Sequence, residues 1–129
     1  MTTIACPVSP FFQSAAQPNK YADKSNAVFF GRLCKTENLS ENIQIAEFQV
    51  LESYKGELNT RIRITNKIES DCSMAFGNAG TNYYVFGNLD DAGKEIIMDG
   101  FPRFFPEHYA NKTNMLTRLD IKQVTNFDI

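Results

Sequence analysis

Five short runs of β-branched and aromatic residues, separated by polar or glycine-containing turns, constrain the fold of this chain most strongly. Runs of this composition and length are typical of β-strands. They occupy residues 26–34, 43–54, 61–68, 81–89 and 95–100. The sequence therefore predicts a mainly β fold, in which these strands enclose the core.

The links between the runs predict how the strands connect. The polar stretch KTENLSEN (35–42) predicts a loop, and Gly56 closes the second run with a turn that needs a positive φ. In the second run the alternation of apolar residues slips between Ile45 and Phe48, which predicts a β-bulge there. DDAGK (90–94) predicts a hairpin turn into the last run.

The two ends of the chain predict less regular structure. Residues 7–25 mix proline, serine, asparagine and alanine, which favours an irregular segment with one helical turn. After Pro106, the residues Tyr109, Leu116 and Leu119 recur at helical spacing, so we expect a C-terminal helix with one apolar stripe.

Five bent strands and a terminal helix predict a five-stranded OB-fold-like closed barrel with the C-terminal helix packed on it. A jelly roll would need about eight strands. We expect one domain over residues 1–129, with residues 1–5 as a leader remnant or recombinant residues.

Charge and hydropathy narrow the classes of partner. The chain has 129 residues and a net charge of −2, which gives no electrostatic footprint for nucleic acid or anionic lipid. No apolar run reaches the roughly 18 residues that a membrane span needs. The sequence predicts no cofactor.

The three cysteines, Cys6, Cys34 and Cys72, allow at most one internal bridge and leave one thiol over. No pair has the CxxC spacing of a zinc or redox site. The alternative is that all three cysteines are reduced and the protein is cytosolic.

His108 is the only histidine. We interpret it as a surface or helix residue, not as a metal ligand or general base.

Several stretches, in this order, resemble the netrin-like domain of the TIMP family, the tissue inhibitors of metalloproteinases. CPVSP (6–10) resembles the family's N-terminal C-x-C-x-P, with Val8 in place of the second cysteine. SNAVFFGRL (25–33) and FQVLESYKG (48–56) resemble its strands, and CSMAFGNAGTNYYVFG (72–87) is the most similar stretch.

The resemblance implies a disulfide between Cys6 and Cys72, and hence an oxidising compartment, secreted or periplasmic. The family's other half-cystines are missing in pairs. Cys34 has no counterpart in the family, and we interpret it as a buried free thiol on the first strand.

The resemblance also implies a binding ridge. In the family, the α-amine and carbonyl of the N-terminal cysteine bind the protease's catalytic zinc. By position, Cys6 is the chelator, Pro7 the pocket residue, and Val8, Ser9 and Pro10 the ridge behind them. Because Ala5 precedes Cys6, its nitrogen is an amide in this chain. We therefore predict no metal site, except at the Cys6 main chain if Cys6 is the mature N-terminus.

The functional prediction is a monomeric, secreted or periplasmic protein-binding domain that is not an enzyme, with a zinc metalloproteinase as the candidate partner. No nucleophile stands beside a histidine in a known motif, and Asp90-Asp91 fits a turn.

One alternative is an OB-fold module that binds nucleic acid or carbohydrate. In that case Arg61 and Arg63 would contact phosphates, and four aromatic residues would stack on the ligand: Phe29, Phe30, Tyr83 and Tyr84. A second is a lipoprotein, since TIAC (3–6) partly resembles a lipobox. Lipidation of Cys6 would leave Cys34 and Cys72 as the pair.

Overall fold

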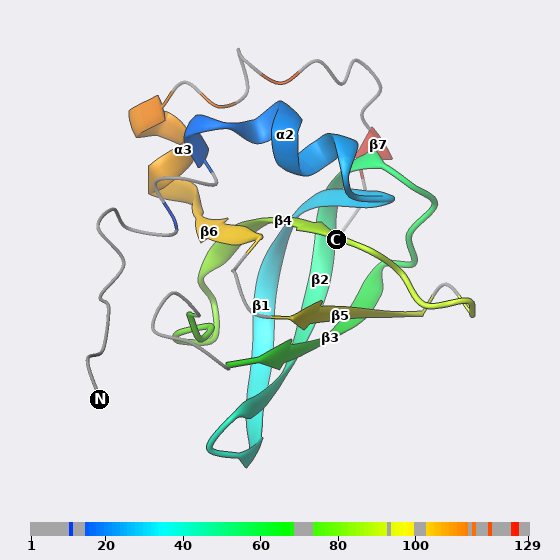
Figure 1. The fold of residues 1–129 in the computed structure, drawn as a ribbon, viewed down its shortest axis with the longest axis vertical. Coiled ribbons are helices and arrows are strands. Elements are labelled where there is room, and N and C mark those ends of the chain that lie inside the picture. The colour runs from blue at the N-terminus through cyan, green and yellow to red at the C-terminus, as the bar shows by residue number, and fades with distance from the viewer. Residues whose placement is uncertain are drawn as a thin grey trace, which may run out of the picture.

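A curved, mixed β-sheet forms most of the structure, a computed structural model (Figure 1). It describes residues 11, 15–68, 74–92, 94–99, 103–113, 115, 119 and 125–126. Six strands follow one another in the order β5-β3-β2-β1-β4-β6, and β7 pairs with β2. The strands are β1 (Ala27–Ser40), β2 (Ile43–Lys55), β3 (Arg61–Lys67), β4 (Asn82–Gly87), β5 (Glu95–Asp99), β6 (Phe104–Pro106) and β7 (Thr125–Asn126).

All five predicted strands are present, so the mainly β prediction is confirmed. The predicted number of five strands is wrong, because β6 adds to β4 and β7 adds to β2. β1 pairs with β2 on one side and with β4 on the other, both antiparallel. β5 pairs with β3 in parallel. DDAGK does form a turn, because Asp90 Oδ1 accepts hydrogen bonds from the main-chain N–H of Lys94 (3.0 Å) and of Glu95 (3.3 Å). The predicted hairpin turn is therefore present, with an antiparallel bridge between Leu89 and Ile96 and a hydrogen bond from the Asp90 N–H to the Glu95 carbonyl (2.8 Å). The strand after the turn nevertheless forms its ladder with β3 and not with β4.

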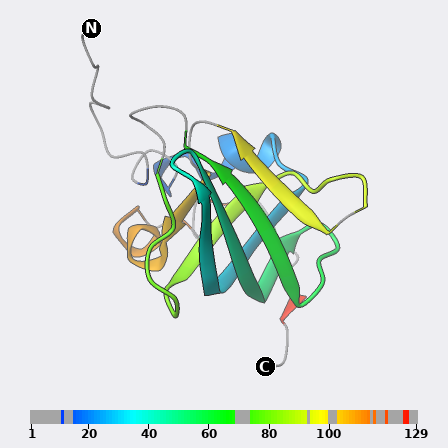
Figure 2. The same ribbon diagram turned by 90° about the horizontal axis from the view of Figure 1, so that it is seen from below.

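The sheet curls strongly (Figure 2), but it is not closed, so the predicted closed barrel is wrong for the described residues. Between β4 and β5 there is one isolated bridge, Leu89 with Ile96. Residues just after β4 form hydrogen bonds with Asn26, the residue before β1, and do not extend a ladder with β5. Leu89 N–H donates to Asn26 Oδ1 (2.8 Å), and Asn88 Oδ1 accepts from Asn26 N–H (2.9 Å). These bonds hold the chain after β4 against the start of β1.

The β1–β2 hairpin is longer than predicted. Residues 35–40, expected in a loop, continue β1, and only residues 41–42 form the turn. All six of these strand residues are exposed, since the hairpin projects beyond the core (Figure 1). A strand segment whose own side chains all face solvent needs no alternating pattern, which explains why the sequence resembled a loop.

The predicted bulge between Ile45 and Phe48 is also wrong. β2 runs in regular register with β3 from Ile43 to Gln49. The irregularity is on the facing strand, where Leu33 pairs with Phe48 but Lys35 pairs with Glu47, which leaves Cys34 as the extra residue. The inward positions of β2 from Gln44 to Val50 include the polar Gln44, so the alternation does not slip at the predicted place. β2 is irregular only further along, at Leu51 and Tyr54, where its register with β1 shifts.

Two layers of apolar side chains lie on the two faces of the sheet. The first part of β1, from Ala27 to Gly31, and most of β4 are buried on both faces, which explains the continuous runs AVFF and YYVF. The inner cluster comprises Ala27, Phe29, Leu33, Ala46, Phe48, Val50, Ile62, Ile64, Phe76, Tyr83, Val85, Ile96, Met98 and Phe104. The outer cluster comprises Ala15, Ala22, Val28, Phe30, Tyr54, Tyr84, Phe86, Phe105, Ala110, Met115 and Leu119.

Two short helices cover the outer cluster (Figure 1). α2 (Pro18–Asp23) lies in the segment predicted to contain a helical turn and contributes Ala22. α3 (Glu107–Thr113) is the predicted helix after Pro106, and it packs Tyr109 and Ala110 against the sheet. Leu116, the middle residue of the predicted stripe, lies outside the described residues.

Candidate functional site

The residues predicted to form the ridge and its disulfide, Cys6–Pro10 and Cys72, lie outside the described residues. The predicted Cys6–Cys72 bridge therefore stays a prediction. Cys34 is the one cysteine in the described part of the chain, and its thiol is free. It is half-buried rather than buried, because it is the extra residue of the β1 bulge, and its Sγ donates to the Arg32 carbonyl at 3.7 Å.

Buried polar side chains hold the segment 74–77, which begins two residues after Cys72. Gln44 bonds both main-chain groups of Phe76: Nε2 donates to its carbonyl (3.1 Å), and Oε1 accepts from its N–H (2.8 Å). Asn66 Nδ2 donates to the Met74 carbonyl at 2.8 Å. Gly77 N–H donates to the Tyr83 hydroxyl at 2.9 Å. Three strands thus fix this segment through side chains, an arrangement that strand patterns do not predict.

The four aromatic residues considered for ligand stacking belong to the core. Phe29 and Phe30 on β1 are 0% and 8% exposed, and Tyr83 and Tyr84 on β4 are 3% and 5% exposed. Tyr83 and Phe76 pack edge to face, and Phe30 lies against Tyr84. None of the four presents a ring face to a nucleic acid or sugar.

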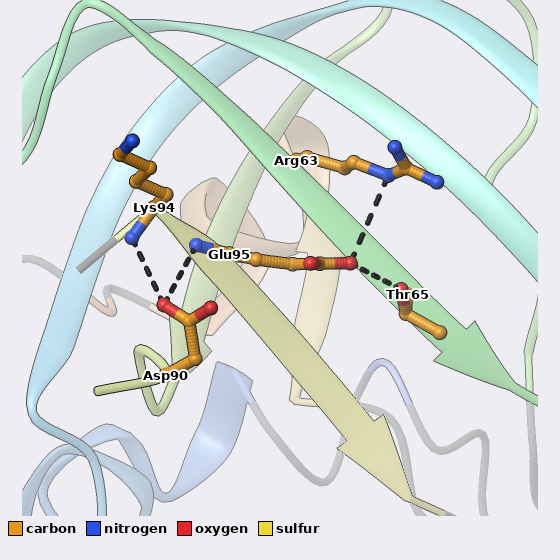
Figure 3. Close-up of polar contacts among 5 residues, drawn as sticks. All are labelled: Arg63, Thr65, Asp90, Lys94 and Glu95. Atoms are coloured by element: carbon orange, nitrogen blue, oxygen red, sulfur yellow. Dashed lines mark hydrogen bonds and ion pairs between the residues drawn. The ribbon is translucent and has the colours of Figure 1, made fainter. Parts of the chain in front are cut away.

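A row of alternating charges crosses the outer face of four adjacent strands. The register places Lys35 of β1 opposite Glu47 of β2, Glu47 opposite Arg63 of β3, and Arg63 opposite Glu95 of β5. Lys35 Nζ lies 3.4 Å from Glu47 Oε2, and Arg63 Nε lies 3.7 Å from Glu95 Oε1. Thr65 Oγ1 donates to the same Glu95 oxygen at 2.7 Å (Figure 3). We call Lys35, Glu47, Arg63 and Glu95 the charge row.

A groove of about 370 Å³ lies beside the charge row, and we call it the cationic groove. It is lined by Glu47, Arg61, Ile62, Arg63 and Lys94. Arg61 and Arg63 alternate with the buried Ile62 and Ile64, as predicted for β3, so both guanidinium groups lie on the outer face. The groove therefore has three cations and one carboxylate.

Two titratable side chains outside the charge row, Tyr54 and His108, have surroundings that fit a structural role. Burial, followed by the neighbouring Tyr84, raises the pKa of Tyr54 far above its ordinary value, so this phenol stays protonated. His108 is exposed on α3 and contacts the Tyr109 ring, as expected for a helix residue. Among the residues with described positions, no three His, Cys, Asp or Glu side chains form a group that could hold a metal ion.

No protein-family model matches the chain, and a comparison with curated proteins finds no significant match. Within the described part of the chain, no helix combines the length and apolar character needed to cross a membrane.

Proposed function

We propose that this chain is a secreted or periplasmic protein-binding domain of OB-type, netrin-like topology, which contacts its partner through the ridge Cys6–Pro10. A zinc metalloproteinase is the partner to test first. The observation that carries the proposal is the strand order. The path β5-β3-β2-β1-β4, with β5 parallel to β3 and antiparallel ladders elsewhere, matches a five-stranded OB arrangement.

The seam between β4 and β5 also fits this topology, since OB-folds are partly open barrels. Leu89 bridges to Ile96 across the seam, and Gly87 lies directly on Ile96, where an added Cβ would be 2.6 Å from Cγ2. The two strands that an OB barrel brings together are therefore neighbours here, although a single bridge joins them.

The fixed segment 74–77 supports the ridge as the binding element. Asn66 and Gln44 anchor Met74 and Phe76 to the sheet. A disulfide from Cys72, two residues before Met74, would connect Cys6 to this anchored main chain. A ridge held in this way loses little conformational entropy on binding, which favours tight complexes.

The test uses the natively exported protein, with its N-terminus and intact mass determined first. The mass shows whether a lipid is attached and whether two of the three thiols are oxidised to a disulfide. Inhibition is then measured against a panel of zinc metalloproteinases. We expect Cys6→Ser and Cys72→Ser each to abolish inhibition, and the matched control Cys34→Ser to retain it. Absence of inhibition by the native protein at micromolar concentration would contradict the inhibitor proposal.

A further inference from the structure

The cationic groove carries positive charge that the described residues do not neutralise. Arg61 and Arg63 are two residues apart on β3, which places them about 6.6 Å apart along one face of the strand. Lys94 adds a third cation from the turn that precedes β5. Glu47, the one acidic residue among the described residues that line the groove, is already paired with Lys35. This concentration of cations stands out on a chain whose net charge is −2.

The three cations differ in how they are held. Arg61 and Lys94 make no ion pair with any other residue that the structure describes. Arg63 meets Glu95 through Nε, and Figure 3 shows its two terminal nitrogens on the far side of the guanidinium group. Glu95 is itself held by Thr65. Arg63 is therefore oriented by its neighbours and still has donors for an incoming anion.

The acidic residues beside the groove decide what kind of anion fits. Glu47 and Glu95 alternate with the cations in the charge row, so a continuous polyphosphate backbone would meet repulsion at every second strand. Among the described residues that line the groove there is no aromatic side chain, so they do not offer the stacking that single-stranded nucleic acids use. An extended peptide places every second side chain on one side, about 6.6 Å apart, which matches Arg61 and Arg63. Carboxylates also suit the planar guanidinium group.

We propose that the cationic groove binds an acidic polypeptide segment of a protein partner, with carboxylates at alternate residues of an extended strand. Arg61 and Arg63 each take one carboxylate, and Lys94 adds long-range attraction. This proposal does not rest on the one made for the ridge Cys6–Pro10.

The test is fluorescence anisotropy with a labelled peptide of sequence Glu-Ser-Glu-Ser-Glu and the full-length protein. We expect binding that weakens as salt rises from about 50 mM to about 500 mM. Arg61→Gln should weaken binding about fivefold, and Arg61→Gln combined with Lys94→Gln about 25-fold, which corresponds to strong exposed pairs. The matched control, Lys24→Gln, removes an exposed charge just after α2 and should bind like the wild type.

Three outcomes would overturn the proposal: an equal loss in Lys24→Gln, unchanged binding by the double variant, or equally tight binding of a labelled oligothymidine. Equal urea midpoints for all variants show that they fold alike. Metalloproteinase inhibition by the same variants reports on the ridge alone. Loss of peptide binding with unchanged inhibition therefore separates the two sites.

Discussion

Gln44 bonds both the N–H and the carbonyl of Phe76, so its side-chain amide takes the place of a strand neighbour for that residue. Gln44 is 5% exposed and Phe76 is 3% exposed. A buried main-chain N–H and carbonyl without partners are costly, because neither can return to water. Gln44 therefore holds Phe76 against the sheet, as Asn66 does for Met74 and Tyr83 for Gly77.

We predict that Gln44→Leu lowers the free energy of unfolding by about 2–4 kcal/mol, because it leaves both Phe76 groups unpartnered. The measurement is urea unfolding followed by circular dichroism. Gln49→Leu is the matched control, since Gln49 is on the same strand but half-buried on the outer face, and it should change stability by less than about 0.5 kcal/mol. Equal effects of the two substitutions would show that the Phe76 contacts contribute nothing.

The turn after β2 gives a second prediction. Gly56 has φ +89°, as predicted, and an added Cβ would lie 2.5 Å from the Asn26 carbonyl oxygen. Gly80 has a similar φ of +92°, but nothing lies within 4 Å of its added Cβ. We expect Gly80→Ala to cost about 1 kcal/mol from backbone strain alone. Gly56→Ala should cost about 3 kcal/mol, because a main-chain clash is added.

Thermal unfolding of the two glycine variants, made singly, measures this difference. If both variants lose the same stability, the close approach between the β2 turn and Asn26 does not constrain the protein.

The buried tyrosine pair predicts how stability depends on alkaline pH. Burial raises the pKa of both Tyr54 and Tyr84 above the ordinary value of 10.0. Above pH 10 the unfolded chain loses these protons while the folded chain keeps them, so the free energy of unfolding falls as pH rises. For Tyr54, whose pKa is raised far above 10.0, the slope reaches about 1.4 kcal/mol per pH unit, and Tyr84 contributes in the same direction.

Urea titrations from pH 8 to pH 12 measure this slope. Tyr54→Phe should make it shallower, since one of the two shifted phenols is removed. An unchanged slope in that variant would contradict the assignment to Tyr54.

The pair Arg63–Glu95 contributes little to stability. Their side chains are 53% and 33% exposed, so solvent screens the interaction. We expect Arg63→Gln and Glu95→Gln each to lower the free energy of unfolding by less than about 1 kcal/mol. A double-mutant cycle with both substitutions gives the coupling, and a value above about 2 kcal/mol would contradict this expectation.

The strand assignments followed from local sequence, and the errors came from contacts between distant residues. RIRITNK shows its alternation directly, since Arg61 and Arg63 are exposed while Ile62 and Ile64 are buried. The β2 bulge was misplaced because Gln44 resembles a surface residue until its bonds to Phe76 are seen. The long hairpin was missed because its exposed residues need no apolar period.

Of the two candidate sites, one comes from the sequence and the other from the structure alone. The ridge Cys6–Pro10 rests on a resemblance in the sequence, and its residues lie outside those that the structure describes. The cationic groove could not be predicted, because Glu47, Arg63 and Lys94 become neighbours only through strand register.

By itself, the sequence determined that five strands form and which residues of β3 face outward, because these properties depend on side-chain alternation within a few residues. Only the tertiary structure decided that β5 joins β3 in parallel, that the sheet stays open between β4 and β5, and that charges from four strands share one row. The arrangement of the strands depends on hydrogen bonds between residues far apart in the chain. Examples are the bond from the Asn26 N–H to Asn88 and the bond from the Leu89 N–H to Asn26. No local pattern records those partners.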